Sequence, residues 1–317
     1  MPDALSTIMS PAPMVFAAGV AVAQLRPGVS LPQSFVKSLA WYLMVAIGLK
    51  GGLEIGKSGL TAALAVDFAA AIGLGIVLAA LAYNLLLLLT RLTPVDRAAL
   101  AAHYGSVSVV TFVAAAAFLT TRGIEYEPHL VAIMAVMEAP AIVVGVWLGR
   151  RHSPEASLLE PVREALTNPS ILILSGGLLA GYLLAEAGGG DAVGHVREPF
   201  LFVLVLFLLH MGLQVGSRLP DVMQAGPGLL AFAVLMPLTG AVLGCLVGAS
   251  LGMSTGGTTL LAVLGASASY IAAPAAVRLA LPEANPTYYG LLPLGVTFPF
   301  NIIVGLPLYL AVASAVT

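Results

Sequence analysis

Two short polar stretches interrupt hydrophobic segments of the sequence. Residues 103–111 read HYGSVSVVT, and residues 265–270 read GASASY. In hydrocarbon an unpaired backbone N–H or C=O costs several kcal/mol, so a helix unwinds there only where the freed groups line a cavity or are buried in protein. Glycine in the first stretch, Gly105, lets the backbone turn and approach a neighbour closely. The two stretches therefore predict a binding site for a small ligand.

Hydroxyl groups are the side-chain chemistry that both stretches share. Ser106 and Ser108 lie in the first and Ser267 and Ser269 in the second, and their oxygens can bind an anion or Na⁺. If each helix unwinds, the amino end of a half-helix presents N–H groups to an anion, and the carboxyl end presents carbonyls to Na⁺. Serine and glycine also let membrane helices pack closely, so any single serine is equally consistent with packing.

One carboxylate, Glu138, lies in the middle of another apolar segment. A charged side chain is costly inside a bilayer, and its presence there indicates function. Glu138 could ligate Na⁺, relay a proton or pair with a buried cation such as His103. The corresponding part of the last apolar segment carries neutral oxygen donors instead. The sodium ligands that we expect are Glu138, Thr111, Thr297 and Asn301.

The composition identifies the class of protein. The chain has 317 residues, of which 59% are hydrophobic and 9% are charged, whereas soluble domains carry about 25% charged residues. We expect an all-α polytopic membrane protein in the lipid bilayer. The single cysteine excludes a disulfide framework, and the net charge of −2 gives no indication of a nucleic-acid partner. P-loop, HExxH, GxSxG and Rossmann motifs are missing, so we expect neither an enzyme nor a cofactor other than Na⁺ as coupling ion.

Apolar runs long enough to cross a bilayer recur along the chain. The ten expected spans lie at about residues 11–26, 33–52, 67–90, 98–120, 129–149, 168–187, 198–217, 227–251, 256–280 and 287–316. The charged linker 150–167 separates five spans in residues 1–149 from five in residues 168–317. Most of the 13 Lys and Arg residues fall on the side of this linker, which predicts a cytoplasmic linker, both termini outside, and a plasma (inner) membrane location.

Two sequence patterns recur in the halves. GLKGG at 48–52 and GLQVG at 212–216 close the second and seventh spans, and Pro140 and Pro299 each precede an aliphatic run with glycine in the fifth and tenth. The polar stretches fall in the fourth and ninth. Five-span halves with opposite orientations form an inverted repeat, and broken helices in corresponding spans are typical of the binding site of a secondary transporter. We therefore expect a 5+5 inverted repeat with helices four and nine broken.

Other charged and aromatic residues have plainer interpretations. Asp67 and Lys50 are expected at span ends, where long side chains reach the interface. A lone histidine such as His210 is typical of hydrogen-bonded packing. Anchoring at the membrane surface is expected for Arg122 and Arg278.

The chain resembles the sodium-dependent bicarbonate transporter family, the SbtA-type permeases first known from cyanobacteria. The segments that carry the resemblance are GLKGG at 48–52, YGSVS at 104–108, MEAPAIV at 137–143, MGLQVGSRL at 211–219 and GASASYIAAPAAVRLALPEANPTYY at 265–289. Two positions differ from the cyanobacterial pattern. Tyr104 replaces the first serine of a Ser-Gly-Ser run, and Tyr270 replaces an acidic residue.

The resemblance implies a homotrimer that takes up bicarbonate together with Na⁺, with the substrate between the two broken spans. Transferred by matching position, the substrate-binding residues are Gly105, Ser106, Ser108, Ser267, Ser269 and Tyr270. A PII-like regulator, known for cyanobacterial members, is not expected here because the linker is much shorter.

The function that we predict from the sequence is Na⁺-coupled uptake of bicarbonate by alternating access. The alternative is a Na⁺- or H⁺-coupled transporter of another small anion, such as a short carboxylate, with Glu138 and His103 as a proton relay in the H⁺-coupled case. A membrane-embedded enzyme that uses the same two residues as acid and base, and a channel, are the remaining hypotheses.

Overall fold

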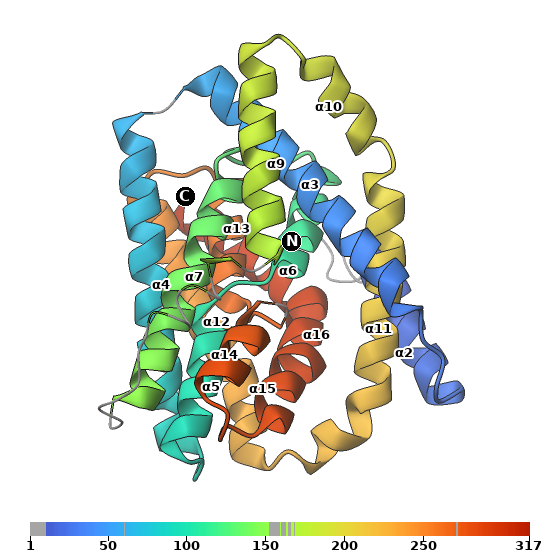
Figure 1. Ribbon diagram of the computed structural model, residues 1–317, viewed down its shortest axis with the longest axis vertical. Helices are drawn as coiled ribbons and strands as arrows, with labels where there is room; N and C mark the ends of the chain where they lie inside the picture. The colour runs from blue at the N-terminus through green and yellow to red at the C-terminus, as the bar shows by residue number, and fades with distance from the viewer. Residues whose placement is uncertain are drawn as a thin grey trace.

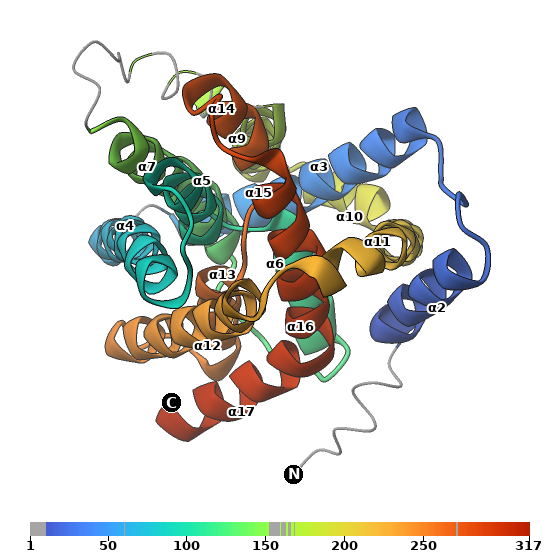
Figure 2. The ribbon, with the colours of Figure 1, turned by 90° about the horizontal axis from the view of Figure 1, so that it is seen from below.

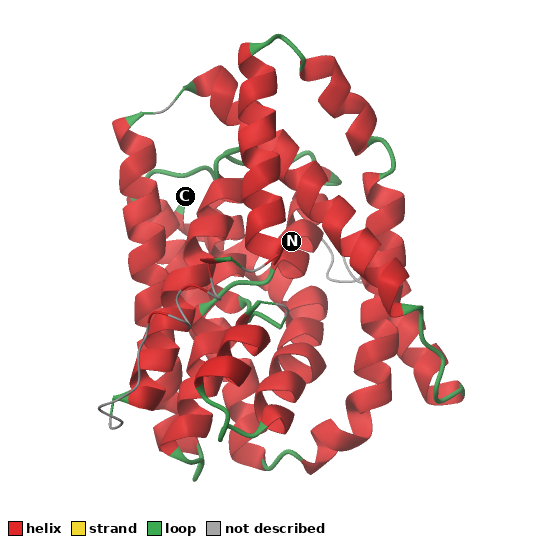
Figure 3. Ribbon diagram, in the orientation of Figure 1, coloured by secondary structure: helices red, strands yellow, loops and turns green. Residues whose placement is uncertain are grey.

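The computed structural model describes residues 11–59, 61–151, 159, 163, 166–167, 169–270 and 272–317. These residues form helices and connecting loops, without a strand among them (Figure 3). Eight helical segments are long and apolar enough to cross a membrane, and two shorter apolar helices cover Pro13–Leu25 and Thr255–Ala266. The prediction of an all-α, multi-pass membrane protein is confirmed. Most of the predicted linker 150–167 lies outside the described residues.

The helices follow the predicted apolar segments closely. The first half contains α2 (Pro11–Leu25), α3 (Gln33–Ser58), α4 (Ala62–Leu89), α5 (Pro94–Gly105), α6 (Val109–Thr120) and α7 (Leu130–Arg150). The second half contains α9 (Pro169–Glu186), α10 (Gly190–Arg197), α11 (Phe200–Gln224), α12 (Pro227–Ser250), α13 (Thr255–Ala266) and α14 (Ala273–Ala280). A final continuous helix consists of α15 (Pro286–Leu292), η1 (Pro293–Thr297), α16 (Phe298–Phe300), η2 (Asn301–Gly305) and α17 (Leu306–Val316).

Two groups of helices face each other across the molecule (Figures 1 and 2). The scaffold group consists of α2, α3, α9 and α11, in which α2 packs on α11 and α3 packs on α9. The core group consists of α4, α5, α7, α12, α13 and α17. In the view of Figure 2, α6, α15 and α16 lie between the two groups.

Glycines allow the scaffold helices to cross closely. A Cβ added to Gly48 in α3 would lie 3.0 Å from the Cα of Gly177 in α9, and a Cβ added to Gly19 in α2 would lie 3.0 Å from the Cα of Gly212 in α11. Small residues at crossings let membrane helices gain van der Waals contact between their backbones. Gly48 and Gly212 are the first glycines of the two GLxxG segments, so the recurring motif marks the two crossings.

Hydrogen bonds between the ends of helices mark the two ends of the helix bundle. Arg150 Nε donates to the carbonyl oxygen of Ala280 at 2.7 Å, and the backbone N–H of Asn285 donates to the Asp96 carboxylate at 2.7 Å. These contacts gather the start of α5 and the ends of α7 and α14 at what we call the linker end. At the opposite end the hydroxyls of Thr255 and Thr317 lie 2.7 Å apart.

The expected positions of Lys50 and Asp67 at span ends are wrong. α3 continues to Ser58 and α4 already begins at Ala62, so both residues lie inside helices. The Lys50 ammonium donates to the Tyr126 hydroxyl at 3.2 Å, and the Asp67 carboxylate lies 3.0 Å from Nε2 of His129. Partners from the loop between α6 and α7 therefore satisfy these groups, and neither side chain needs to reach the interface.

Candidate functional site

Both polar stretches separate two helices. Ser106 to Ser108 lie between α5 and α6, and residues 267–272 lie between α13 and α14, with residue 271 outside the described part of the chain. Ser106 and Ser267, which end the first helix of each pair, have nearly the same backbone angles: φ −85° and ψ 170° for Ser106, φ −83° and ψ 170° for Ser267. We call the two stretches the first and the second break.

The two breaks are bonded to each other. The backbone N–H of Ser108 donates to the hydroxyl of Ser267 at 2.9 Å, and the backbone N–H of Ser269 donates to the carbonyl oxygen of His103 at 2.9 Å. Two serine hydroxyls also accept from backbone N–H groups in the first turn of the helices that follow. Ser108 Oγ accepts from the N–H of Thr111 at 3.2 Å, and Ser269 Oγ accepts from the N–H of Ala273 at 3.2 Å. Groups freed by the unwinding thus find partners within the protein, as a low-dielectric environment requires.

A small cavity lies where the breaks meet. Its volume is about 10 Å³, the room that a single water molecule needs. α6 begins at Val109, which lines the cavity, and α14 begins at Ala273, three residues after the lining residue Tyr270. The N–H groups and partial positive charge of helix amino ends favour an anion. The lining residues are Val107, Ser108, Val109, Glu138, Ser170, Ser269 and Tyr270.

Glu138 contributes the only carboxylate among those lining residues. Its side chain belongs to α7, is 2% exposed, and has one oxygen, Oε2, without a hydrogen-bond partner among the described residues. The Ser106 hydroxyl donates to its backbone carbonyl at 3.0 Å, which ties α7 to the first break. An unpartnered carboxylate oxygen beside a cavity of this size is suited to hold one small cation.

The structure brings together some of the predicted substrate ligands. Ser108, Ser269 and Tyr270 line the small cavity, whereas Ser106 and Ser267 bond the breaks to their surroundings. The Tyr270 hydroxyl lies near the side chains of Ser108 and Thr111 but makes no hydrogen bond with the described residues.

Gly105 lets the backbone approach a neighbouring helix closely, as expected from the sequence. A Cβ there would lie 2.6 Å from the Cβ of Ala79, so only glycine lets α5 approach α4 this closely. The close approach fixes where the first break begins, although Gly105 itself does not line the cavity.

Three predicted sodium ligands stand outside the cavity lining. Thr297 Oγ1 donates to the carbonyl oxygen of Ala233 at 2.7 Å. Asn301 donates to the carbonyl oxygen of Ala266 at 2.8 Å and accepts from the Tyr309 hydroxyl at 2.7 Å. These bonds hold the final helix to α12 and α13. Thr111 lies closer, at the start of α6, through its bond to Ser108.

His103 is buried beside the first break but makes no ion pair with Glu138 in the described residues. Its Nδ1 lies 2.7 Å from the carbonyl oxygen of Ala99, and its ring stacks on Tyr289 with centroids 5.0 Å apart. The structure therefore does not contain the His103–Glu138 contact that the sequence left open.

Ser170 is the lining residue that sequence reasoning missed. It is the second residue of α9 and is 6% exposed. In the sequence it follows Asn168 and Pro169, a pattern that marks a helix start and nothing more. Its place in the site depends on how deeply the start of α9 lies against the core group, which is a property of the tertiary structure.

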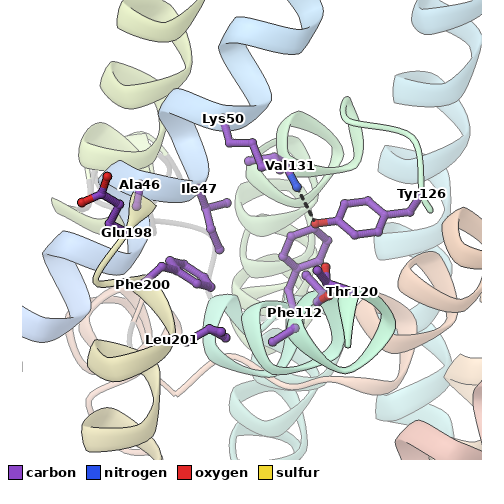
Figure 4. A pocket seen from close by; sticks show the side chains of 12 residues that line it. Ala46, Ile47, Lys50, Phe112, Thr120, Tyr126, Val131, Glu198, Phe200 and Leu201 are labelled. Atoms are coloured by element: carbon purple, nitrogen blue, oxygen red, sulfur yellow. Dashed lines mark hydrogen bonds between the residues drawn. The ribbon is translucent and has the colours of Figure 1, made fainter. Parts of the chain in front are cut away.

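Two of the larger cavities between the scaffold group and its neighbours bear on the site. The opposite-end cavity, about 220 Å³, is lined by Lys50 of α3, Phe112 and Thr120 of α6, and Phe200 of α11 (Figure 4). The linker-side cavity, about 590 Å³, is lined by residues of α3, α9, α11, α14 and α15. The linker-side cavity shares Ser170 and Tyr270 with the small cavity, whereas the opposite-end cavity shares no lining residue with it.

Comparison with known proteins places the chain in a family. A search of curated protein sequences gave no match. A family model described as the Na⁺-dependent bicarbonate transporter superfamily matches residues 11–314, nearly the whole chain, and this confirms the resemblance that the sequence indicated. The match covers both breaks, Glu138 and the two scaffold crossings. The chain therefore belongs to the Na⁺-dependent bicarbonate transporter superfamily.

Proposed function

We propose that this protein is a secondary active transporter that couples uptake of bicarbonate to Na⁺ by alternating access. The observation that carries the proposal is the small cavity. Glu138, whose Oε2 has no hydrogen-bond partner among the described residues, lines it together with Ser108 and Ser269, which accept from N–H groups in the first turns of α6 and α14. Its carboxylate suits a cation and the helix ends suit an anion. One place thus has complementary groups for both ions of a symport reaction.

Na⁺ binds first in this mechanism, at the Glu138 carboxylate, and the hydroxyls of Ser108 and Ser269 are left to donate hydrogen bonds to the anion. Without the cation, the carboxylate repels an incoming anion. With Na⁺ bound, the local charge is neutralised and the amino ends of α6 and α14 dominate. Bicarbonate then binds between the breaks, and its affinity depends on the Na⁺ already present.

Bicarbonate has four heavy atoms and needs more room than one water molecule, so the breaks must separate when it binds. They are joined by the Ser108–Ser267 and Ser269–His103 hydrogen bonds, and a small displacement of one break widens the space. Thr111, Thr297 and Asn301 remain candidates for a further sodium site, and their oxygens have the chemistry for it.

The ten-span inverted repeat is part of the proposal, with α5–α6 and α13–α14 as the broken fourth and ninth spans. Paired contacts support it. Gly48 meets Gly177 between the second and sixth spans, and Gly212 meets Gly19 between the seventh and first. If the two five-span halves are exchanged, the crossing of the second and sixth spans becomes the crossing of the seventh and first. Lys50 and Gln214 occupy the same position in the two GLxxG segments, and they line cavities at opposite ends of the bundle.

The two-group architecture supports alternating access. The core group moves relative to the scaffold group and exposes the small cavity to one end and then to the other. The arrangement of lining residues supports an inward-facing state here, because Ser170 and Tyr270 connect the small cavity with the linker-side cavity. We propose that the linker end faces the cytoplasm and that both termini lie outside a plasma (inner) membrane, as the distribution of Lys and Arg predicts.

A homotrimer remains part of the proposal on family grounds, and no PII-like regulator is invoked because of the short linker. Coupling to H⁺, or transport of a short carboxylate, is the alternative that the family assignment does not favour.

Removal of the Ser108 and Ser269 hydroxyls at the cavity tests the site. The double variant Ser108→Ala/Ser269→Ala is expected to raise the KM for bicarbonate about 10-fold or more, because a hydrogen bond to a charged group contributes roughly 1.5–3 kcal/mol. Labelled-bicarbonate uptake in proteoliposomes measures this. Thr61→Ala/Ser254→Ala is the matched control, since it removes two helix caps away from the cavity. An unchanged KM in the cavity variant, with the protein folded, would place the substrate elsewhere.

A further inference from the structure

The linker-side cavity contains positive and hydrogen-bonding groups that the transport mechanism above does not use. Lys37 of α3 and Arg218 of α11 line it, and neither makes an ion pair with a carboxylate among the described residues. The lining includes no Asp or Glu. Two cations in a cleft with no carboxylate in its walls raise the local concentration of anions.

A buried imidazole lies deeper in the same cavity. His210 of α11 is 6% exposed, and its Nδ1 has no hydrogen-bond partner among the described residues. Because a buried polar atom without a partner costs about 1–3 kcal/mol, an orphaned ring nitrogen in a cavity wall indicates a ligand. Gln214, one helical turn further along α11, adds an amide to the same wall.

The position of the cavity connects these groups with the transport path. Ser170 and Tyr270 line both the small cavity and the linker-side cavity. An ion that leaves the breaks towards the linker end passes these two residues before it reaches His210 and Gln214. Arg218 lies further out and donates to the carbonyl oxygen of Gly290 at 3.5 Å, a long bond that leaves most of its guanidinium donors for a ligand.

We propose that the linker-side cavity is a second anion-binding site, in which His210 and Gln214 donate hydrogen bonds to a small oxyanion and Lys37 and Arg218 supply its countercharge. That the bound anion is the transported bicarbonate rests on the proposed function; the existence of the anion site does not. The site receives the anion as it leaves the breaks and lowers the barrier to its release at the linker end.

Trp41 provides a reporter inside the cavity. The chain has two tryptophans, Trp41 in the cavity lining and Trp147 on α7, so Trp147→Phe leaves one fluorophore at the site. Quenching by iodide, an anion, is compared with quenching by neutral acrylamide in purified protein at low ionic strength, where screening is weak. The ratio of the two quenching constants reports how strongly the cavity concentrates anions, independently of transport.

In the Trp147→Phe background, Lys37→Gln/Arg218→Gln is expected to lower the iodide-to-acrylamide ratio about twofold or more. Both side chains are exposed, so the fold should tolerate the change. Arg26→Gln/Arg91→Gln, which removes two exposed arginines outside the cavity lining, is the matched control and should leave the ratio unchanged. An equal ratio in the cavity variant and its parent would overturn the proposal.

Competition identifies the occupant. Sodium bicarbonate is expected to protect Trp41 from iodide more than sodium gluconate does at equal ionic strength. His210→Phe should raise the bicarbonate concentration for half protection about threefold or more, the equivalent of one lost hydrogen bond. Equal protection by gluconate would contradict the assignment to small oxyanions. Failure of the proposed function would instead appear as absent bicarbonate uptake in proteoliposomes, with the charge-dependent iodide signal intact.

Discussion

The Glu138→Gln variant should fold and reach the membrane but lose Na⁺-dependent bicarbonate uptake. Glutamine keeps the shape of the side chain and removes the charge that faces the small cavity. Removal of one partner of a buried charge pair costs about 3–5 kcal/mol, which corresponds to a loss of more than about 100-fold in Na⁺ affinity. The measurement is uptake of labelled bicarbonate as a function of Na⁺ concentration, beside thermal unfolding of the purified protein.

Glu283→Gln is the matched control for this experiment. Glu283 is exposed in the loop between α14 and α15, so the same chemical change there should leave the Na⁺ dependence as it is in the parent protein. If Glu138→Gln took up bicarbonate with the parent's Na⁺ dependence, Glu138 would not be a sodium ligand. A folded variant with Na⁺-independent uptake would mean that the carboxylate couples the ions without binding the substrate.

Gly181→Val is expected to destabilise the protein strongly. A Cβ at Gly181 in α9 would overlap the carbonyl oxygen of Leu49 in α3, and backbone atoms cannot move aside as a flexible side chain can. Overpacking typically costs about 1–3 kcal/mol, and we expect a fall in Tm of roughly 5–10 °C or loss of the folded protein. Thermal unfolding followed by fluorescence-detected size-exclusion chromatography measures it.

Gly176→Val supplies the control on the same helix. Gly176 is exposed in α9, and a Cβ there meets no atom within 4 Å. The substitution costs the same helix propensity at both positions, so the difference between the two variants isolates the crossing of α9 with α3. Similar Tm values for the two variants would show that the close approach of these helices is not needed for stability.

The helices, and the two polar stretches that lie between helices, could be predicted from the sequence because they depend on local properties. An apolar run of sufficient length specifies a membrane helix wherever it occurs. Residues 104–108 and 267–270 put hydroxyls and glycine into such runs, and the structure separates two helices at each place. Glu138 stands out in the same way, as a carboxylate in an apolar segment, and lies at the cavity.

Contacts between distant segments could not be predicted in the same way. Lys50 and Asp67 were expected at span ends because a predicted apolar span is ended at a charged residue. In the structure, Tyr126 and His129, in a loop far along the chain, are their polar partners. Ser170 reaches the cavity only because α9 begins beside the core group.

Asn301 shows the same limit for a candidate ligand. Its partners, the Ala266 carbonyl and the Tyr309 hydroxyl, belong to another helix and to a position two turns away. The residue type alone does not distinguish an asparagine amide that is hydrogen-bonded to another helix from one that is free to bind an ion. Sequence reasoning therefore identified which elements surround the site but not which oxygens remain free to bind an ion.

Uptake of labelled bicarbonate into proteoliposomes, with and without an inward Na⁺ gradient, tests the central claim most directly. The mechanism predicts accumulation above the external concentration only when the gradient is present, and collapse of that accumulation when a sodium ionophore dissipates it. Bicarbonate uptake that does not depend on the Na⁺ gradient would contradict Na⁺-coupled bicarbonate transport by this chain. The absence of bicarbonate uptake by correctly inserted protein in both conditions would contradict it as well.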